Sequence, residues 1–218
     1  MEKTPHLDQR VESARQLLGK YSGLERVVDP RPTGVAEWGV YESLASKVLL
    51  VAPHSVRHWR DGKVKGGEPG TGALVRALAE AFSQDCIFLK SDGAEVGWQQ
   101  RDDLLVSTLS TAVVGGRAVI DFHGMSDKHG VNICIGTGST SGQLGKSFLA
   151  AALAAGINAV SIGMNVPFSA TATHTVTSYL QLFGHDSAMQ LELAPYYREP
   201  FKKEAGVIEV FAHLLDTL

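Results

Sequence analysis

Residues suited to metal chemistry stand where apolar segments of the sequence end. His54 follows the apolar run at 48–52, and Glu68 lies in the polar, Gly-rich loop that comes next. His123 follows a later apolar run, and Glu192 interrupts another. A catalytic zinc ion usually has three protein ligands, His or carboxylate, and one position open to water. Two histidines and one glutamate at neighbouring strand ends would satisfy that number.

A carboxylate that does not bind the metal could complete this chemistry. Metal-bound water has its pKa lowered toward ~7, and a nearby carboxylate can act first as general base and then as general acid. We predict this role for Glu192, because an unpaired carboxylate in an apolar strand would be costly. Plainer interpretations stay open: His54 as a hydrogen-bonded loop residue and Glu68 as a solvated one. The sequence has no HxxH or HExxH pair that would decide between them.

Asp121 precedes His123 by two residues. Side chains at i and i+2 point the same way along a strand, so Asp121 could accept a hydrogen bond from His123 behind a metal ion. It could equally be an ordinary carboxylate at the end of a strand.

Alternating apolar segments predict the scaffold that would position these residues. The segment 24–43 contains Pro30, Pro32 and Gly34 and is expected to be irregular or hairpin-like. Helices are expected at 7–20, from about 72 to 82, and at 104–114, 146–156 and 203–218. Strands are expected at 48–52, 86–89, 117–122, 131–135, 159–163 and 188–193. Strands that alternate with helices indicate an α/β fold with a mainly parallel, mixed sheet flanked by helices.

One domain over residues 1–218 is the expected organisation, since no linker or internal repeat is evident. Within it, 1–47 would form an N-terminal helix and an irregular entry segment, 48–198 the core, and 199–218 a C-terminal helix.

The composition is that of an ordinary globular protein, with 44% hydrophobic and 20% charged residues. A net charge of −3 gives no general attraction to nucleic acid or anionic membrane. Cys86 and Cys134 lie in apolar segments, which indicates buried thiols rather than a disulfide or a zinc site. No signal-peptide core and no window of ~18 apolar residues is present. We therefore expect a cytoplasmic enzyme or binding protein that acts on small molecules.

Two further segments carry charge or glycine. The basic run from Arg57 to Lys65 is either a solvated loop or a surface that steers an anionic substrate. The segment 136–147 (GTGSTSGQLGKS) resembles a phosphate-binding loop, but Thr140 stands where that motif requires glycine. Lys146 more simply opens a helix, although oriented amides in the loop could still hold a carboxylate.

An ordered set of motifs resembles the N-formylglutamate amidohydrolase family over about 48–198. The motifs are APHSVRHWRDG, EPGTGALVRALAEA, VIDFHGMSD, NICIGTG, NVPFSATATHTVTSYL and QLELAPYYR. The resemblance implies a zinc carboxypeptidase-like, phosphorylase/hydrolase-type α/β fold. It also implies metal-dependent hydrolysis of N-acyl amino acids, formylglutamate in histidine breakdown being the type substrate.

The resemblance also implies roles for individual residues. His54, Glu68 and His123 match the zinc ligands, and Glu192 matches the general base of zinc carboxypeptidases. Asn165 matches a segment on the substrate side. Arg57, Arg60 and Arg198 are candidates for holding a substrate carboxylate, since a guanidinium suits bidentate pairing, and His174 for reaching the scissile carbonyl. A loop histidine at 174 and a surface arginine at 198 are the plainer alternatives.

The sequence departs from the family pattern at two positions near the proposed ligands. Val56 follows His54-Ser55 where the family usually has glycine, and Glu68 replaces a common aspartate. These departures leave the expected metal chemistry intact but weaken the inference of the substrate from the resemblance. The leading hypothesis is a zinc-dependent amidohydrolase of N-acyl amino acids. The alternatives are a zinc peptidase that cleaves a peptide or C-terminal amide, and a non-catalytic binding protein on the same fold.

Overall fold

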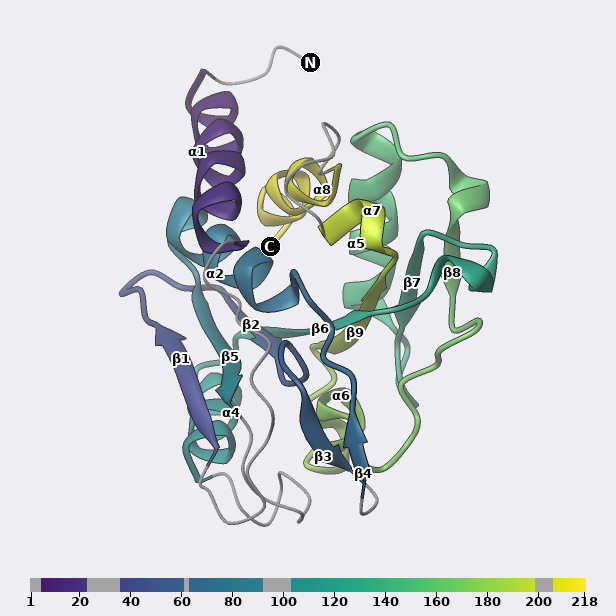
Figure 1. Cartoon of the computed structure of the whole chain (residues 1–218). Helices are drawn as coiled ribbons and strands as arrows, with labels where there is room; N and C mark the ends of the chain where they lie inside the picture. Colours follow the sequence, from purple (N-terminus) through teal and green to yellow (C-terminus); the bar gives the residue numbers. More distant parts are fainter. Residues whose placement is uncertain (1–4, 23–35, 61–62, 92–102, 199–205) are drawn as a thin grey trace.

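A single central sheet organises the computed structural model, which describes residues 5–22, 36–60, 63–91, 103–198 and 206–218 (Figure 1). Its seven strands run in the order β1-β5-β2-β6-β9-β7-β8. Four neighbouring pairs are parallel, whereas β1 with β5 and β7 with β9 are antiparallel. The predicted α/β fold with a mainly parallel sheet is confirmed. The strands are β1 (Glu37–Tyr41), β2 (Val48–Ala52), β5 (Asp85–Ser91), β6 (Ala118–Gly124), β7 (Ile133–Gly136), β8 (Ile162–Met164) and β9 (Ala188–Leu193).

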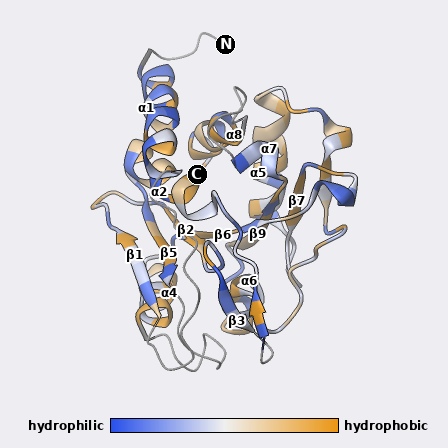
Figure 2. Ribbon diagram, in the orientation of Figure 1, coloured by the Kyte–Doolittle hydropathy of each residue, from blue (hydrophilic) through white to orange (hydrophobic). Residues whose placement is uncertain are grey.

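The central strands are buried because helices cover both faces of the sheet. Leu50 of β2 belongs to a core cluster shared with α1 (Pro5–Ser22), α2 (Thr71–Phe82), α5 (Gln143–Ala154) and α8 (Gly206–Leu215). Leu49 and Val51 point the other way, into a cluster with α4 (Asp103–Val114) and α6 (Val176–Leu182). Each fully buried leucine contributes about 1.5–3 kcal/mol. Hydropathy follows this arrangement: α8 is largely hydrophobic, whereas α1 carries many hydrophilic residues (Figure 2).

One predicted strand is wrong in its first half. Residues 159–161 form a 3-10 helix, η2 (Ala159–Ser161), and the strand β8 begins only at Ile162. The side chain of Asn158 accepts a hydrogen bond from the Val160 amide, which starts the helical turn. Val160 is 80% exposed, so its apolar character does not mark a buried strand.

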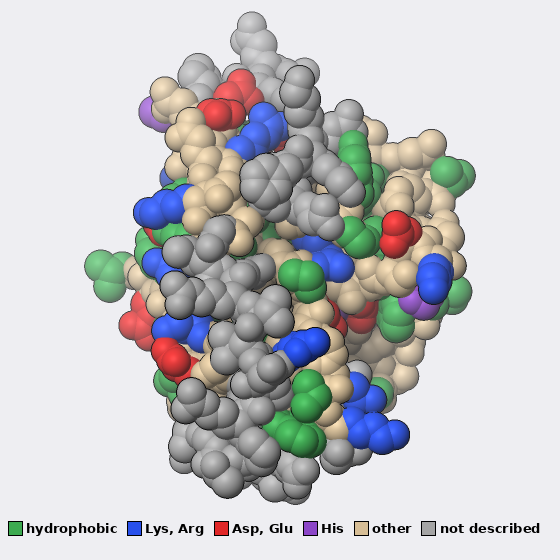
Figure 3. All heavy atoms as spheres, viewed as in Figure 1, with side chains coloured by type: hydrophobic (Ala, Val, Ile, Leu, Met, Phe, Trp, Pro, Cys, Tyr) green, Lys and Arg blue, Asp and Glu red, His purple; other side chains and the backbone are tan. Residues whose placement is uncertain are grey.

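Several short elements were not predicted. They are β1, the two-stranded hairpin of β3 (His58–Arg60) and β4 (Lys63–Lys65), η1 (Asp127–His129), α6 and α7 (Pro195–Arg198). Lys and Arg side chains lie at the surface over the hairpin, where Lys63 is exposed (Figure 3). The remainder of the entry segment up to residue 35 and the start of the predicted C-terminal helix lie outside the described residues. Among the described residues, no helix has both the length and the apolar character needed to cross a membrane.

The parallel strands β2, β6 and β9 lie side by side, so their carboxyl ends meet at one edge of the sheet. Ligands of open α/β sheets bind outside such an edge. His54 follows the end of β2, His123 lies at the end of β6, and Glu192 lies near the end of β9. The fold therefore brings three distant segments of the sequence to one place.

Candidate functional site

His54 and Glu68 lie at the two ends of one excursion of the chain, which contains the β3-β4 hairpin. The amide of Glu68 donates to the carbonyl oxygen of His54 at 2.8 Å and closes this excursion. The carbonyl oxygen of Glu68 in turn accepts bonds from the amide and hydroxyl of Thr71, in the first turn of α2. Residues that are far apart in the loop are thus held next to each other by the backbone.

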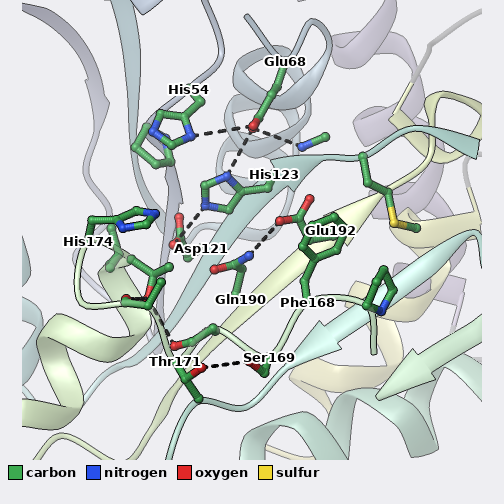
Figure 4. A pocket seen from close by; sticks show the side chains of 18 of the residues that line it. His54, Glu68, Asp121, His123, Phe168, Ser169, Thr171, His174, Gln190 and Glu192 are labelled. Carbon is green, nitrogen blue, oxygen red and sulfur yellow. Dashed lines mark hydrogen bonds and ion pairs between the residues drawn. The ribbon is translucent and has the colours of Figure 1, made fainter. Parts of the chain in front are cut away.

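The carboxylate of Glu68 lies between two imidazole rings (Figure 4). Its Oε1 lies 3.6 Å from Nδ1 of His54, and its Oε2 lies 3.2 Å from Nδ1 of His123. The amide of Gly124 donates to the same Oε2 at 3.1 Å. On the far side of the His123 ring, Nε2 lies 3.1 Å from Oδ2 of Asp121. His123 is therefore held between two carboxylates.

The charges in this group depend on one another. Burial alone would raise the pKa of Glu68, but the charge of His123 and the close approach of the His123 and His54 rings outweigh it, so that pKa lies well below its usual range. Burial alone would lower the pKa of His123, but Asp121 and Glu68 outweigh it, so that pKa lies well above its usual range.

The residues present fit a bound metal ion. Ligand atoms of His54, Glu68 and His123 all lie within 4.8 Å of one another. Nδ1 of His54 is buried and has no hydrogen-bond partner among the described residues, although it faces the carboxylate of Glu68. Two imidazole nitrogens and one carboxylate oxygen form a donor set that catalytic zinc commonly takes. Asp121 stands where a carboxylate commonly orients a metal-bound histidine.

Glu192 and Gln190 lie on the neighbouring strand and face the same cavity. The register of β6 and β9 places Glu192 beside His123 and Gln190 beside Asp121. Nε2 of Gln190 donates to Oε1 of Glu192 at 2.7 Å. Burial raises the pKa of Glu192. The sequence analysis missed Gln190, although it precedes Glu192 by two residues, as Asp121 precedes His123.

His58, which was not assigned to the site from the sequence, packs against His54. The rings of His58 and His54 stack with their centroids 4.1 Å apart and their planes 7° apart. His58 is buried on β3, and its Nδ1 lies 3.2 Å from the carbonyl oxygen of Val56. The stack restricts rotation of the His54 ring and so helps to aim its Nδ1 at Glu68.

The cavity in front of these residues measures about 470 Å³. His54, Glu68, His123, Glu192 and His174 all line it. Its wall also includes residues from the end of β6 and from the segment between β8 and α6. These are Met125, Ser126, His129, Pro167, Phe168, Ser169, Ala170, Thr171, Ala172 and Thr175.

Two other residues assigned to substrate binding are hydrogen-bonded within the protein. Arg198 is buried; its Nε donates to the carbonyl oxygen of Leu193 at 3.2 Å, and its Nη1 donates to that of Pro69. Asn165 accepts from the amide of Thr137 at 2.8 Å through Oδ1. Neither side chain lines the cavity, so within the described part of the chain both hold loops near the site.

Of the two arginines of the hairpin region that were assigned to substrate binding, Arg57 has a described side chain, and it does not line the cavity. That side chain is exposed. Arg60 ends β3, and its side chain lies outside the described part of the structure. Their assignment to substrate binding stays a prediction.

The loop that resembles a phosphate-binding motif is filled by side chains. The amide of Thr137 donates to Asn165, and the amide of Ser139 donates to Oε1 of Gln181 at 2.8 Å. These amides are therefore engaged within the protein and not directed at a ligand. A nucleotide site in this loop is disfavoured.

No protein-family model matches the sequence, and no curated protein sequence matches it. Solved structures do match the fold. A gene product of Agrobacterium tumefaciens, Atu2144, superposes with a TM-score of 0.59 at 16% identity, over 84% of this chain and 96% of that one. A bacteriophage poly-gamma-glutamate hydrolase gives a TM-score of 0.55 at 16% identity, over 86% and 90%.

A metallo-carboxypeptidase from Burkholderia cenocepacia gives a TM-score of 0.51 at 12% identity, over 94% of this chain and 68% of that one. At such low identities the likeness establishes the fold alone. The chain has the zinc carboxypeptidase-like α/β fold, and a candidate His-Glu-His metal site lies at the carboxyl edge of its sheet.

Proposed function

We propose that this protein is a zinc-dependent hydrolase that cleaves the acyl amide bond of N-acyl amino acids. The observation that carries the proposal is the arrangement of His54, Glu68 and His123, whose ligand atoms lie within 4.8 Å of one another beside a cavity. Glu192, on the adjacent strand, supplies a carboxylate outside this set. The resemblance of the motifs to N-formylglutamate amidohydrolases supports the type of bond and substrate.

The three proposed ligands have distinct tasks. His54 and His123 would bind zinc through Nδ1, because these are the atoms that face Glu68. Asp121 would hold the other nitrogen of the His123 ring and so fix its orientation. A zinc ion in this set supplies a Lewis acid for the acyl carbonyl and for water.

Glu192 would move the proton during the reaction. It takes a proton from the attacking water as the water oxygen bonds to the acyl carbon, and it returns a proton to the leaving nitrogen as the C–N bond breaks. The products are a carboxylic acid, such as formate, and a free amino acid. Gln190 holds one oxygen of Glu192, which leaves the other for proton transfer. A raised pKa suits both the base and the acid role.

The remaining residues would orient the substrate. His174 lines the cavity and would donate to the carbonyl of the scissile bond. Arg57 and Arg60 belong to the excursion between two proposed ligands and would meet the α-carboxylate of the substrate. We assign Arg198 and Asn165 to holding the loops of the site, since Arg198 donates to backbone carbonyls and Asn165 bonds to the amide and hydroxyl of Thr137.

Cleavage of a peptide amide is the second candidate. The same chemistry would serve it, and two proteins with this fold are named as a metallo-carboxypeptidase and a poly-gamma-glutamate hydrolase. A non-catalytic binding protein would also be consistent with the fold, but it would have no need for a buried Glu192 paired with Gln190.

The test combines metal analysis with a substrate panel. Purified protein should contain about one equivalent of zinc, and chelator should abolish its activity. N-formyl amino acids, N-acetyl amino acids and dipeptides should be assayed side by side, with release of the free amine as the readout. Faster hydrolysis of the N-acyl substrates is expected, whereas faster hydrolysis of dipeptides would favour the peptidase. Full activity in metal-free protein would refute both.

A further inference from the structure

A small apolar cluster lies apart from the two large cores and borders the cavity. Met125, Cys134 and Ala194 are buried in it, and Val131 and Phe168 pack against it while remaining partly exposed. Met125 and Phe168 also line the cavity. The cluster therefore gives one wall of the cavity an apolar backing that the polar wall around His54 lacks.

Phe168 is held beside the proposed general base. Its carbonyl oxygen accepts a bond from the thiol of Cys134 at 3.4 Å. Cys134 pairs in register with Glu192 across β7 and β9. Figure 4 shows the ring of Phe168 beside the side chain of Glu192. The ring of His129 packs edge-on against the ring of Phe168, with centroids 4.9 Å apart.

The mechanism places the leaving group at this wall. Glu192 returns a proton to the leaving nitrogen, so the substituent on that nitrogen must lie near Glu192 and hence near Phe168. Pro167 and Ala170 extend the apolar surface there, and no Lys or Arg lines the cavity within the part of the chain that is described. An acidic substrate side chain at this wall would be desolvated next to the carboxylate of Glu192, which is unfavourable.

We propose that Phe168 and Met125 form an apolar shelf that selects the side chain of the leaving amino acid. This inference rests on the proposed function and deepens it. The preferred substrates are N-acyl amino acids with apolar side chains, such as leucine, methionine or phenylalanine. The α-carboxylate of the substrate would instead be bound by the basic hairpin region. The shelf thereby separates this protein from an enzyme for formylglutamate, whose side chain is acidic.

The first test is a comparison of kcat/KM for N-formylmethionine, N-formylleucine and N-formylglutamate. We expect the apolar substrates to be favoured by about 10–200-fold, the range that apolar pockets achieve for small changes of side chain. Phe168→Ala should reduce that preference by about tenfold or more, mainly through KM of the apolar substrates. A wild-type preference for N-formylglutamate, or an unchanged preference in Phe168→Ala, would overturn the shelf.

Phe183→Ala is the matched control. Phe183 is 69% exposed, directly follows α6 and does not line the cavity. The same aromatic side chain is removed, but the substrate preference should stay at the wild-type value. Loss of preference in this variant too would show that the effect is general and would count against the shelf.

A binding measurement separates failure of the shelf from failure of the proposed function. Zinc-loaded wild-type protein is titrated with free methionine and with free glutamate, the products, so no turnover is needed. Tighter binding of methionine, weakened by Phe168→Ala, supports the shelf even where no N-acyl substrate is cleaved. Equal or tighter binding of glutamate refutes the shelf and leaves the proposed amide hydrolysis standing.

Discussion

The candidate site has two halves that are built differently. Asp121, His123, Gln190 and Glu192 lie on the adjacent central strands β6 and β9, and their relative positions follow from the register of that ladder. His54 and Glu68 lie in loops and are held together by the bond of the Glu68 amide to the His54 carbonyl and of the Gly124 amide to the Glu68 carboxylate.

The difference indicates where the site is robust and where it is fragile. The strand half is supported by buried backbone bonds and by cores on both faces of the sheet. The loop half depends on a few bonds and on close packing against Arg198. We therefore expect changes in the strand half to affect proton transfer or zinc affinity while the structure stays the same. Changes under the loop should affect zinc binding and stability together.

The largest effect is expected from Glu192→Gln. Removing the proposed general base should lower kcat by about 10²–10⁴-fold, because proton transfer to and from a positioned side chain contributes that much. Turnover of the best substrate at saturating zinc is the measurement. Glu37→Gln, an exposed glutamate on the edge strand β1, is the control and should retain wild-type kcat. Wild-type turnover in Glu192→Gln would contradict the assignment.

Asp121→Asn should weaken zinc binding by about 10–100-fold, the usual cost of losing a partner that orients a metal-bound histidine. The amide keeps the shape of the carboxylate but not its charge behind Nε2 of His123. A competition titration with a chromophoric chelator gives the dissociation constant.

Asp85→Asn is the matched control for that variant. Asp85 is also buried and is paired with Arg117 beside the start of β5, outside the cavity lining. It should lose thermal stability while keeping wild-type zinc affinity. Similar affinity losses in both variants would show a general effect of burial rather than a specific role for Asp121.

Gly124→Ala should damage the loop half. A methyl group there would lie 2.9 Å from Cζ of Arg198 and 3.1 Å from Cβ of Glu68. Such overpacking costs about 1–3 kcal/mol, and the displacement of Glu68 should also weaken zinc binding. Gly19→Ala, in α1 with no atom within 4 Å of the new methyl group, should instead stabilise the protein by about 0.5–1 kcal/mol. Thermal unfolding of both variants with and without zinc decides this; equal behaviour would contradict the packing account.

The smallest expected effect is on the pH profile. Burial raises the pKa of Glu192, so its base form is lost at a higher pH than for an exposed glutamate as the pH falls. The acid limb of kcat/KM should therefore lie above the ordinary value of 4.5. Gln190→Leu removes a hydrogen bond that lowers this pKa and should move the limb further upward. An acid limb that does not move in Gln190→Leu would contradict the claim that Gln190 lowers the pKa of Glu192.

The strands and helices that carry long buried runs could be predicted from the sequence. The run at 48–52 coincides with β2, because continuous apolar residues mark a strand covered on both faces, and the mostly apolar segment 188–193 coincides with β9. The edge strand β1 was missed, since its residues are exposed or half-buried and follow a segment rich in proline. The strand expected at 159–163 failed in its first half because a local Asn158 cap outweighed the apolar pattern.

The site likewise has features that a local sequence pattern could predict and features that it could not. Strand alternation suggested that Asp121 supports His123, and the same rule applied to the last strand would have found Gln190. No local pattern could show that His58 stacks on His54, or that the guanidinium of Arg198 bonds to the carbonyls of Pro69 and Leu193. The bond from Arg198 to Pro69 joins segments that are remote in the sequence, and the stack of His58 on His54 depends on how the chain turns between them. Its position in the loop and the resemblance to a family indicated Glu68, but no local spacing did, and its role as a ligand stays a prediction.

The central claim is that three residues bind the metal and a fourth carboxylate performs proton transfer without binding it. Zinc titration of Glu68→Gln beside Glu192→Gln tests this division most directly. We predict that Glu192→Gln binds one zinc ion with wild-type affinity, and that Glu68→Gln loses more than about 100-fold in affinity, beyond the usual cost of an outer partner. Wild-type zinc affinity in Glu68→Gln, or loss of zinc from Glu192→Gln, would contradict the account.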